Sequence, residues 1–145
     1  MARSIRDTMT TDPRSITPRD AVVEAARLMR DEDIGSLPVT EEGRLVGMLT
    51  DRDIAVRVVA EGRSPDSTTV GEVLSPDPVA ARPDQDLDEA LHLMAQHQVR
   101  RLPVVEEDRL VGILAQADVA LEEKEKKIGE LVESISQPSG AERPS

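Results

Sequence analysis

Thr50 and Asp53, a hydroxyl and a carboxylate three residues apart, are the side chains whose types and spacing could most readily do chemistry. They follow a mostly apolar strand predicted at residues 44–49 and open a predicted helix, so both point the same way at a helix start. Free backbone N–H groups there attract anions, and a carboxylate accepts hydrogen bonds from sugar hydroxyls. Thr-x-x-Asp is also a plain capping box in many helices that bind no ligand. These residues alone leave both interpretations open.

The same unit occurs twice in the chain. Residues 36–53 return as residues 101–118, sixty-five positions later, with eleven of the eighteen positions identical and no gap. A repeat at a fixed period sets the architecture. The second copy keeps a carboxylate at Asp118 but has Ala115 where the first has Thr50, and alanine is the poorer helix cap. We therefore expect one competent site, built around Thr50 and Asp53, or none.

Two adjacent arginines, Arg100 and Arg101, lie at the end of a predicted helix, where the first copy has the uncharged Gly35 and Ser36. The planar guanidinium group can donate two parallel hydrogen bonds to a phosphate. Basic residues at a helix end also complement the helix dipole without binding anything. The arginine pair is therefore a candidate anion site, with a solvated helix end as the alternative.

Other chemistry is poorly supported. His92 and His97 are five residues apart, a spacing that does not put two side chains on one helix face, so we expect surface histidines and no metal site. The chain has no cysteine, which excludes thiolate ligands and thiol nucleophiles. Nucleophile elbows, phosphate-binding glycine loops and zinc-binding helix motifs are missing too. We predict that the protein is not an enzyme.

Charge and composition restrict the partners. The chain has 145 residues, 18 of them basic and 29 acidic, for a net charge of −11, which repels a phosphate backbone. It has no Phe, Tyr or Trp, so bases cannot stack on aromatic rings. Nucleic acid is therefore an unlikely partner. With neither an apolar run of about 18 residues nor a secretory signal, we expect no membrane association and a cytoplasmic protein.

Each repeat predicts strand, helix, strand, strand and helix, and thus an α/β fold. In the first, a capping box at Thr17 with Pro18 predicts a helix to about residue 34, followed by strands at 37–39 and 44–49 and a helix from Thr50. In the second, a helix from Pro83 precedes strands at 102–105 and 109–114 and a helix from Gln116 to about 134. We assign residues 5–60 and 70–122 to the repeats, 61–69 to a linker, 123–136 to a helical extension and 137–145 to a disordered tail. A sixty-residue unit is marginal alone, so we expect one module.

Several short segments resemble the CBS domain, the family named after cystathionine β-synthase. They are residues 5–10, 35–39 and 47–53 of the first copy, and 73–76, 100–105 and 112–114 of the second. Together the copies resemble a CBS pair, also called a Bateman module, over residues 5–122. The layout and the string at residues 97–101 are also similar to hypoxic response proteins of actinobacteria. The resemblance implies two repeats packed about a pseudo-twofold axis.

The resemblance also implies a function. CBS pairs that resemble this one bind adenosine-containing ligands such as AMP, ADP or ATP between the repeats, as regulatory ligands and not as required cofactors. It assigns the ribose to Thr50 and Asp53, or to Asp118 in the second copy, and the phosphate to Arg100 or Arg101. An adenine slot would be lined by Asp12, Pro13, Ile34, Leu37 and Pro38, or by the second-copy set Asp77, Pro78, Val99, Leu102 and Pro103, and Ser36 is a further candidate ligand-binding residue.

Partners follow from the same resemblance. We expect a homodimer formed through the apolar stripes Ile54/Val58 and Leu91/Met94, and an unknown protein partner on which the module acts in trans. The favoured function is a sensor of an adenosine-type small molecule. The alternative is a ligand-free dimeric stress-response or interaction protein that has lost nucleotide binding, which Ala115 and the lack of aromatic residues support.

Overall fold

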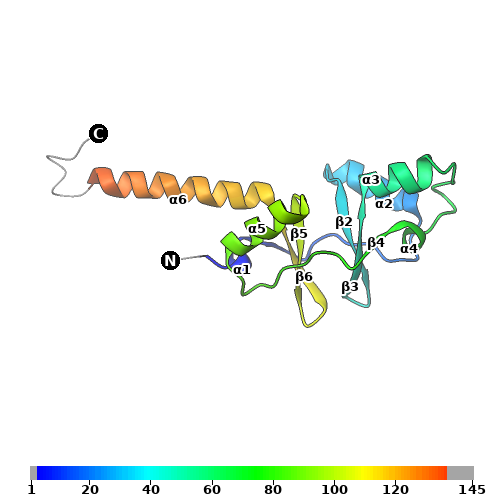
Figure 1. The fold of residues 1–145 in the computed structure, drawn as a ribbon, viewed down its shortest axis with the longest axis horizontal. Helices are drawn as coiled ribbons and strands as arrows, with labels where there is room; N and C mark the ends of the chain where they lie inside the picture. Colours follow the sequence, from blue (N-terminus) through cyan, green and yellow to red (C-terminus); the bar gives the residue numbers. More distant parts are fainter. Residues whose placement is uncertain (1–2, 137–145) are drawn as a thin grey trace.

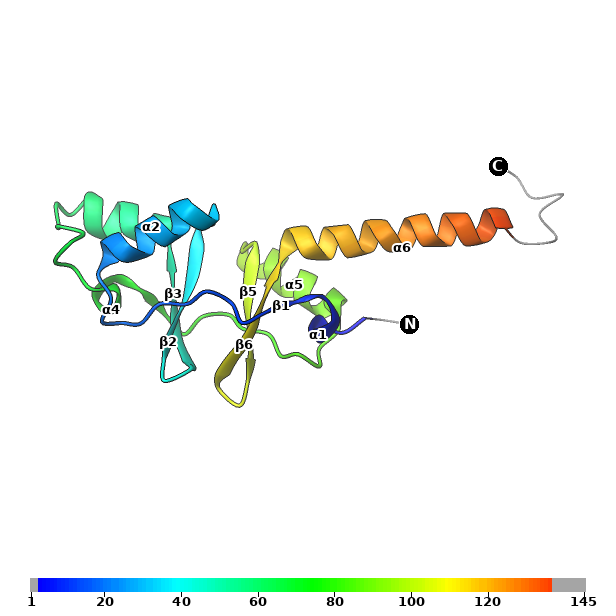
Figure 2. The same ribbon diagram turned by 180° about the vertical axis from the view of Figure 1, so that it is seen from behind.

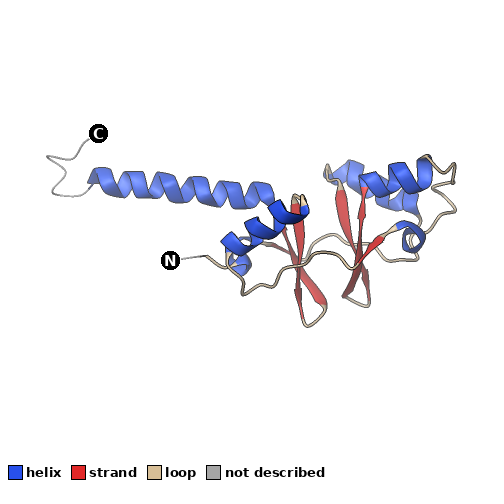
Figure 3. Ribbon diagram, in the orientation of Figure 1, coloured by secondary structure: helices blue, strands red, loops and turns tan. Residues whose placement is uncertain are grey.

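The computed structural model describes residues 3–136 and shows two similar halves side by side (Figure 1). In each half, helices lie at the upper end of the strands and a hairpin turn lies at the lower end, while connecting segments cross the strands at mid-height (Figure 3). The helices are α1 (Ile5–Thr8), α2 (Val22–Glu32), α3 (Asp51–Ile54), α4 (Val70–Val73), α5 (Leu87–His97) and α6 (Gln116–Ser136), with a π-helical turn η1 (Ala55–Val59). The strands are β1 (Thr10–Thr11), β2 (Ser36–Glu41), β3 (Arg44–Thr50), β4 (Ser75–Pro76), β5 (Arg101–Glu106) and β6 (Arg109–Ala115).

The described strands form one antiparallel sheet whose halves are related by a pseudo-twofold axis. Each repeat contributes a hairpin, β2–β3 or β5–β6, and the hairpins meet where Arg44 pairs with Arg109, its own equivalent sixty-five residues later. The flanking hydrogen bonds are also equivalent: Leu45 N–H donates to the Asp108 carbonyl at 3.1 Å, and Leu110 N–H to the Gly43 carbonyl at 3.0 Å. The predicted α/β fold with pseudo-twofold symmetry is confirmed.

The repeats exchange their leading segments. Strand β1 pairs with β6 of the second repeat, and β4 pairs with β3 of the first. Ile5 is consequently buried in the second core, whereas Val70 and Val73 are buried in the first. Glycine at position 47 permits the close approach of β4 to β3. A Cβ atom there would lie 2.8 Å from the Ser75 carbonyl oxygen, which is too close for any side chain. Residues 5–60 and 70–122 therefore do not pack as independent units.

Helices α2 and α5 begin four residues later than the sequence predicts, whereas α6 begins at Gln116 as predicted. Asp20 does accept a hydrogen bond from Thr17 N–H at 2.9 Å, but this closes a turn, and α2 starts only at Val22. The reason is long-range: the Val22 and Val23 N–H groups donate to the carbonyls of Thr68 and Pro65 in the connecting segment. Helix α5 likewise starts at Leu87, and not at Pro83, with its first N–H bonded to the Arg3 carbonyl.

Only part of each stripe expected at a dimer interface is available to a second molecule. Val58 has no exposed surface and Met94 is 2% exposed, because both belong to the hydrophobic cores of their repeats. Ile54 and Leu91 are partly buried against the same cores. Helical spacing marks an apolar face but cannot say whether the sheet or a second molecule covers it.

Helix α6 leaves the body of the molecule and projects past the second repeat, as both sides of the molecule show (Figures 1 and 2). It runs two residues beyond the predicted end at residue 134. Within the part of the chain that the structure describes, no helix combines the length and the apolar character needed to cross a bilayer. The tail predicted at residues 137–145 lies outside the described residues.

Candidate functional site

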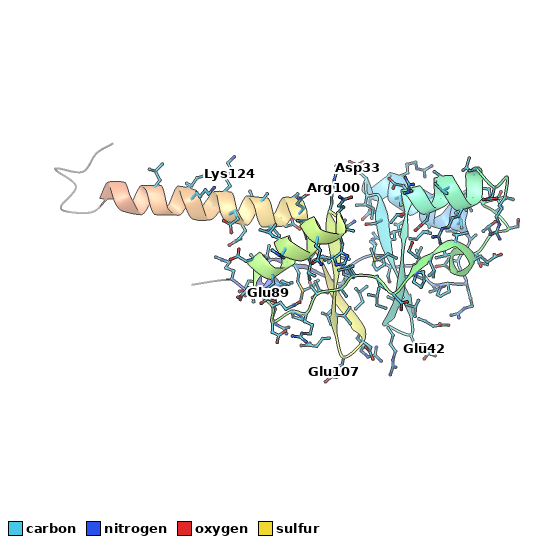
Figure 4. The ribbon with its side chains drawn as sticks, in the orientation of Figure 1. Asp33, Glu42, Glu89, Arg100, Glu107 and Lys124 are labelled. Carbon is cyan, nitrogen blue, oxygen red and sulfur yellow. The ribbon has the colours of Figure 1, made fainter. Side chains whose placement is uncertain are left out.

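A cleft of about 800 Å³ lies between the repeats, within the usual range for small-molecule sites. The corner between α2 and β2, the end of β3 and the start of α3 form its first wall. Strand β4 with the segment after it, and the corner between α5 and β5, form its second wall. Figure 4 shows Asp33 and Arg100 facing each other from the two repeats. The lining residues are Asp33, Ile34, Gly35, Ser36, Met48, Thr50, Asp51, Arg52, Ser75, Pro76, Asp77, Pro78, Val79, Gln98, Val99, Arg100, Arg101 and Pro103.

Thr50 is held on the first wall by a complete capping box. Its hydroxyl accepts a hydrogen bond from Asp53 N–H at 3.0 Å, and the Asp53 carboxylate accepts one from Thr50 N–H at 2.9 Å. The neighbouring Asp51 carboxylate lies over Gly35, where an added Cβ atom would approach its Oδ2 to 2.9 Å. Asp51 N–H also donates to the Gly35 carbonyl at 2.9 Å. A small residue at position 35 therefore lets a carboxylate sit at the cleft surface.

The Asp53 carboxylate does not line the cleft. Asp53 is 7% exposed, and besides Thr50 N–H its carboxylate accepts hydrogen bonds from the Ser75 hydroxyl at 3.1 and 3.3 Å. Arg57 Nε lies 3.9 Å from Asp53 Oδ1, and Arg57 Nη1 donates to the carbonyls of Val73 and Leu74. Asp53 and Arg57 thus hold the segment between the repeats against the first helix, and Ser75 stands between Asp53 and the cleft.

The second wall contributes two of the three arginines that line the cleft. Arg100 is exposed, and the half-buried Arg101 donates from Nη1 to the Ser36 carbonyl of the first repeat at 3.5 Å. Burial lowers the pKa of Arg101, and the nearby charge of Asp118 acts in the opposite direction. An arginine remains charged near neutral pH in either case. A half-desolvated guanidinium group is a stronger partner for an anion than one in bulk water.

The cleft can bind a ligand that carries both hydroxyls and negative charge. Its lining includes the carboxylates of Asp33, Asp51 and Asp77, which accept hydrogen bonds from hydroxyl and amino groups. It also includes the guanidinium groups of Arg52, Arg100 and Arg101, which suit phosphate or carboxylate. Apolar side chains such as Ile34 and Val99 lie between these groups. Asp33, Asp51 and Arg52 belong to the first wall, and Asp77, Arg100 and Arg101 to the second, so acceptors for hydroxyl groups and donors for an anion lie within one cleft.

The pseudo-symmetric counterpart is a different surface. A hollow of about 510 Å³ is lined by Arg100, Arg101, Ala115, Gln116, Ala117 and Ala120, and three of these side chains are methyl groups. Ala115 supplies no hydroxyl to cap α6, and Gln116 replaces the carboxylate of Asp51. Asp118, partly buried, lies close enough to Arg101 to affect its pKa. The repeats therefore present one well-equipped cleft, on the side of Thr50.

The structure brings together five of the eleven site residues proposed from the sequence: Thr50, Ile34, Ser36, Arg100 and Arg101. The other six do not line this cleft. Leu37 and Pro38 are buried in the first repeat, Asp53 lies beneath Ser75, and Asp118 lies near Arg101. Asp12 and Pro13 follow β1, which pairs with β6, and so lie on the pseudo-symmetric side of the molecule.

The exchanged leading segments explain the main residues that sequence reasoning missed. Ser75, Asp77 and Pro78 follow α4 and reach the Thr50 side because β4 pairs with β3. The residues expected to serve the second site therefore complete the first. Asp33, Asp51 and Gln98 also line the cleft, and Asp33 and Gln98 end their helices with φ values of 55° and 54°. A left-handed residue is a common way for a helix to end, and an aspartate and a glutamine there gave no specific signal in the sequence.

Metal binding has no support among residues 3–136. These residues contain no group of three His, Cys, Asp or Glu side chains placed to hold a metal ion. His92 and His97 are both exposed on α5.

Comparison with protein families gives two matches to the CBS domain, over residues 2–60 and 70–125. The CBS domain-containing protein YhcV of Bacillus subtilis is 49% identical over 118 residues, which cover 81% of this chain and 84% of YhcV. Hypoxic response protein 1 of Mycobacterium tuberculosis is 39% identical over 134 residues, which cover 92% of this chain and 94% of that protein.

Solved structures agree. The hypoxic response protein I structure, which holds two coordinated zinc ions, has a TM-score of 0.76 at 39% identity and covers 82% of this chain and 98% of that one. The CBS pair of MJ0100 with 5′-methylthioadenosine and S-adenosylmethionine has a TM-score of 0.76 at 26% identity, covering 87% of this chain and 99% of that one. CBSX2 with AMP also has a TM-score of 0.76 at 26% identity, covering 86% of this chain and 98% of that one.

Proposed function

This chain belongs to the CBS-domain family as a pair of repeats, and we propose that it is a regulatory module that senses an adenosine-containing ligand in the cleft beside Thr50. The observation that carries the proposal is the cleft of about 800 Å³ with Thr50 and Asp51 on one wall and Arg100 and Arg101 on the other. Related CBS pairs hold AMP, 5′-methylthioadenosine and S-adenosylmethionine. The finer choice among AMP, ADP, ATP and related adenosine compounds is part of the test.

The two walls have separate roles in this proposal. The guanidinium groups of Arg100 and Arg101 bind the phosphate, because the planar fork matches phosphate oxygens. The ribose lies against Thr50, and its hydroxyls replace the Ser75 hydroxyl as donors to the Asp53 carboxylate. That exchange of one hydroxyl for another leaves the number of hydrogen bonds to Asp53 unchanged, so it carries little energetic penalty.

In this proposal, ligand binding changes the conformation of the module through β4, the strand that contains Ser75. Ser75 lies in β4, which joins the repeats, and a ligand that takes Asp53 from Ser75 releases one of the bonds that hold β4 to α3. A ligand shifts a conformational equilibrium only by its differential affinity for the two states, and this exchange supplies such a difference. We propose that a protein partner reads the change in trans, and that the module works as a homodimer in the cytoplasm.

Isothermal titration of the full chain with AMP, ADP, ATP and S-adenosylmethionine tests the proposal. We expect at least one ligand to bind with a micromolar dissociation constant, equivalent to about −8 kcal/mol. Arg101→Gln should weaken a phosphate-bearing ligand by about tenfold or more, because bonds to charged groups contribute roughly 1.5–3 kcal/mol. Arg82→Gln, at an exposed arginine outside the cleft, is the matched control and should bind like the parent chain. Flat titrations with every ligand would leave the alternative of a ligand-free interaction protein.

A further inference from the structure

The second repeat keeps the carboxylate of Asp53 at Asp118 but has no equivalent of the arginine beside it. In the first repeat, Arg57 lies four residues after Asp53 in the same helical segment, with Nε 3.9 Å from its carboxylate. The counterpart of Arg57 is Glu122, whose side chain forms a salt bridge with Arg3 of the N-terminal segment. A cation beside Asp118 must therefore come from outside this turn of α6.

Arg101 brings a guanidinium group to this place from the neighbouring strand. Its counterpart in the first repeat is the uncharged Ser36, and the hairpins pair Arg101 with Ala115 as they pair Ser36 with Thr50. The methyl group of Ala115 leaves space beside Arg101, in the hollow of about 510 Å³ that both residues line. Asp118 follows in the first turn of α6. The arginine of the first repeat thus lies on the helix, whereas that of the second lies on the cleft wall.

The side chain of Arg101 is accessible from both sides of the seam between the repeats. It lines the cleft beside Thr50 and also the hollow at the start of α6. On the cleft side, its Nη1 donates to the Ser36 carbonyl of the first repeat at 3.5 Å. Burial lowers the pKa of Arg101, and the charge of Asp118 acts against this effect. Arg101 is therefore half-buried between a carbonyl of one repeat and a carboxylate of the other.

We propose that Asp118 is a positioning residue, whose carboxylate holds the Arg101 guanidinium group at the seam, in place to bind an anion in the cleft beside Thr50. An arginine side chain has many rotamers, and a group that is already restricted loses less entropy on binding. A carboxylate on the α6 side restricts Arg101 without lining the cleft. The inference rests on the proposed function for the anion. It gives Asp118 a role different from the ribose acceptor expected from the sequence.

Isothermal titration of the full chain with AMP and with adenosine, which lacks the phosphate, tests this role. Asp118→Asn should weaken AMP by about three- to fivefold, the size of effect expected for a partly exposed ion pair, and leave adenosine unchanged. Asp118→Glu keeps the charge and should restore most of the AMP affinity. Glu122→Gln is the matched control, because it removes the same charge one turn further along α6, where the partner is Arg3. In an Arg101→Gln chain, Asp118→Asn should have no further effect on AMP.

Urea unfolding without any ligand gives a measurement that does not depend on the proposed function. Asp118→Asn and Arg101→Gln should each lower the urea midpoint, and the double variant should lower it by less than the sum of the two shifts, because the side chains interact. A parent chain that binds neither AMP nor adenosine would refute the proposed function, and the urea measurement would then decide whether Asp118 holds Arg101.

Three results would overturn the inference. Additive shifts of the urea midpoint would show that the two side chains do not interact. An equal loss of AMP and adenosine binding in Asp118→Asn would place Asp118 at the sugar. Unchanged or tighter AMP binding in the same variant would show that the carboxylate does not position Arg101 for the phosphate.

Discussion

Ser75→Ala removes one hydrogen bond from a buried carboxylate without touching the rest of its surroundings. The Ser75 hydroxyl lies 3.1 and 3.3 Å from the two oxygens of Asp53, which is 7% exposed. Hydrogen bonds to charged groups contribute about 1.5–3 kcal/mol net. The lower part of that range applies, because Thr50 N–H and Arg57 stay beside the carboxylate. We therefore expect the free energy of unfolding to fall by about 1.5 kcal/mol.

Urea unfolding at one fixed protein concentration measures this loss, because a dimer would make stability depend on concentration. With a urea dependence of about 1–3 kcal/mol per molar, the midpoint should fall by about 0.5–1.5 M. Far-UV circular dichroism must report the transition, since the chain has no aromatic residue to fluoresce. Thr10→Val is the matched control: Thr10 is the equivalent residue of the other repeat and is exposed, so the midpoint should change little.

The same variant tests how the ligand reaches Asp53. If ribose hydroxyls replace the Ser75 hydroxyl, then Ser75→Ala removes a competitor, and an adenosine ligand should bind more tightly although the protein is less stable. Equal midpoints for Ser75→Ala and Thr10→Val would refute the hydrogen bond to Asp53. If Ser75→Ala is destabilised but binds the ligand less tightly, the hydrogen bond from Ser75 to Asp53 is supported. The replacement of the Ser75 hydroxyl by ribose hydroxyls is then refuted.

Other variants test the close contact of Gly47 with β4, the N-caps of α3 and α6, and the loss of stability at low pH. Gly47→Ala should lower the free energy of unfolding by about 1–3 kcal/mol, measured by urea unfolding, because its Cβ would meet backbone of β4. Thr50→Ala should cost about 0.5–2 kcal/mol, and Ala115→Thr should raise stability by a similar amount by completing a capping box with Asp118. The Thr69 N–H and hydroxyl and Arg63 lower the pKa of Glu72, so its contribution is present above the unfolded pKa near 4.3 and is lost as pH falls through the lower folded value. Glu72→Gln should therefore lower the thermal midpoint at pH 7, and the difference should vanish in strong acid.

The repeat predicted the same order of elements in both halves, and the resemblance to the CBS domain predicted the pseudo-twofold packing. Local patterns placed the hairpin strands β2, β3, β5 and β6 to within two residues, yet α2 and α5 begin later than their capping signals predict. The first N–H groups of α2 bond to carbonyls more than forty residues away. A capping rule that considers only neighbouring residues cannot detect such partners.

The residues of the candidate site that come from one repeat could be predicted from the sequence. Those that reach the cleft because the repeats exchange their leading segments could not. Thr50 follows from its position at the end of β3, and Arg100 from its position at the end of α5. The presence of Asp77 and Pro78 beside Thr50 follows only from the pairing of β4 with β3 across the repeats. Asp53 shows a further limit: a capping box and a ribose acceptor have the same sequence, and only burial behind Ser75 shows which role the unliganded protein uses.

The differences between the repeats favour a ligand over a bare scaffold. A pseudo-twofold axis places equivalent residues opposite each other, so two unchanged repeats would present like charges across the seam. Here the equivalent corners differ: Gly35 and Ser36 face Arg100 and Arg101. The Thr50 and Asp51 positions correspond to Ala115 and Gln116 in the second repeat, so only the first repeat offers a hydroxyl and an acid at these positions. Exposed arginine and aspartate side chains in an open cleft contribute little to the stability of the fold. A ligand with a hydroxyl-bearing end and an anionic end accounts for both walls.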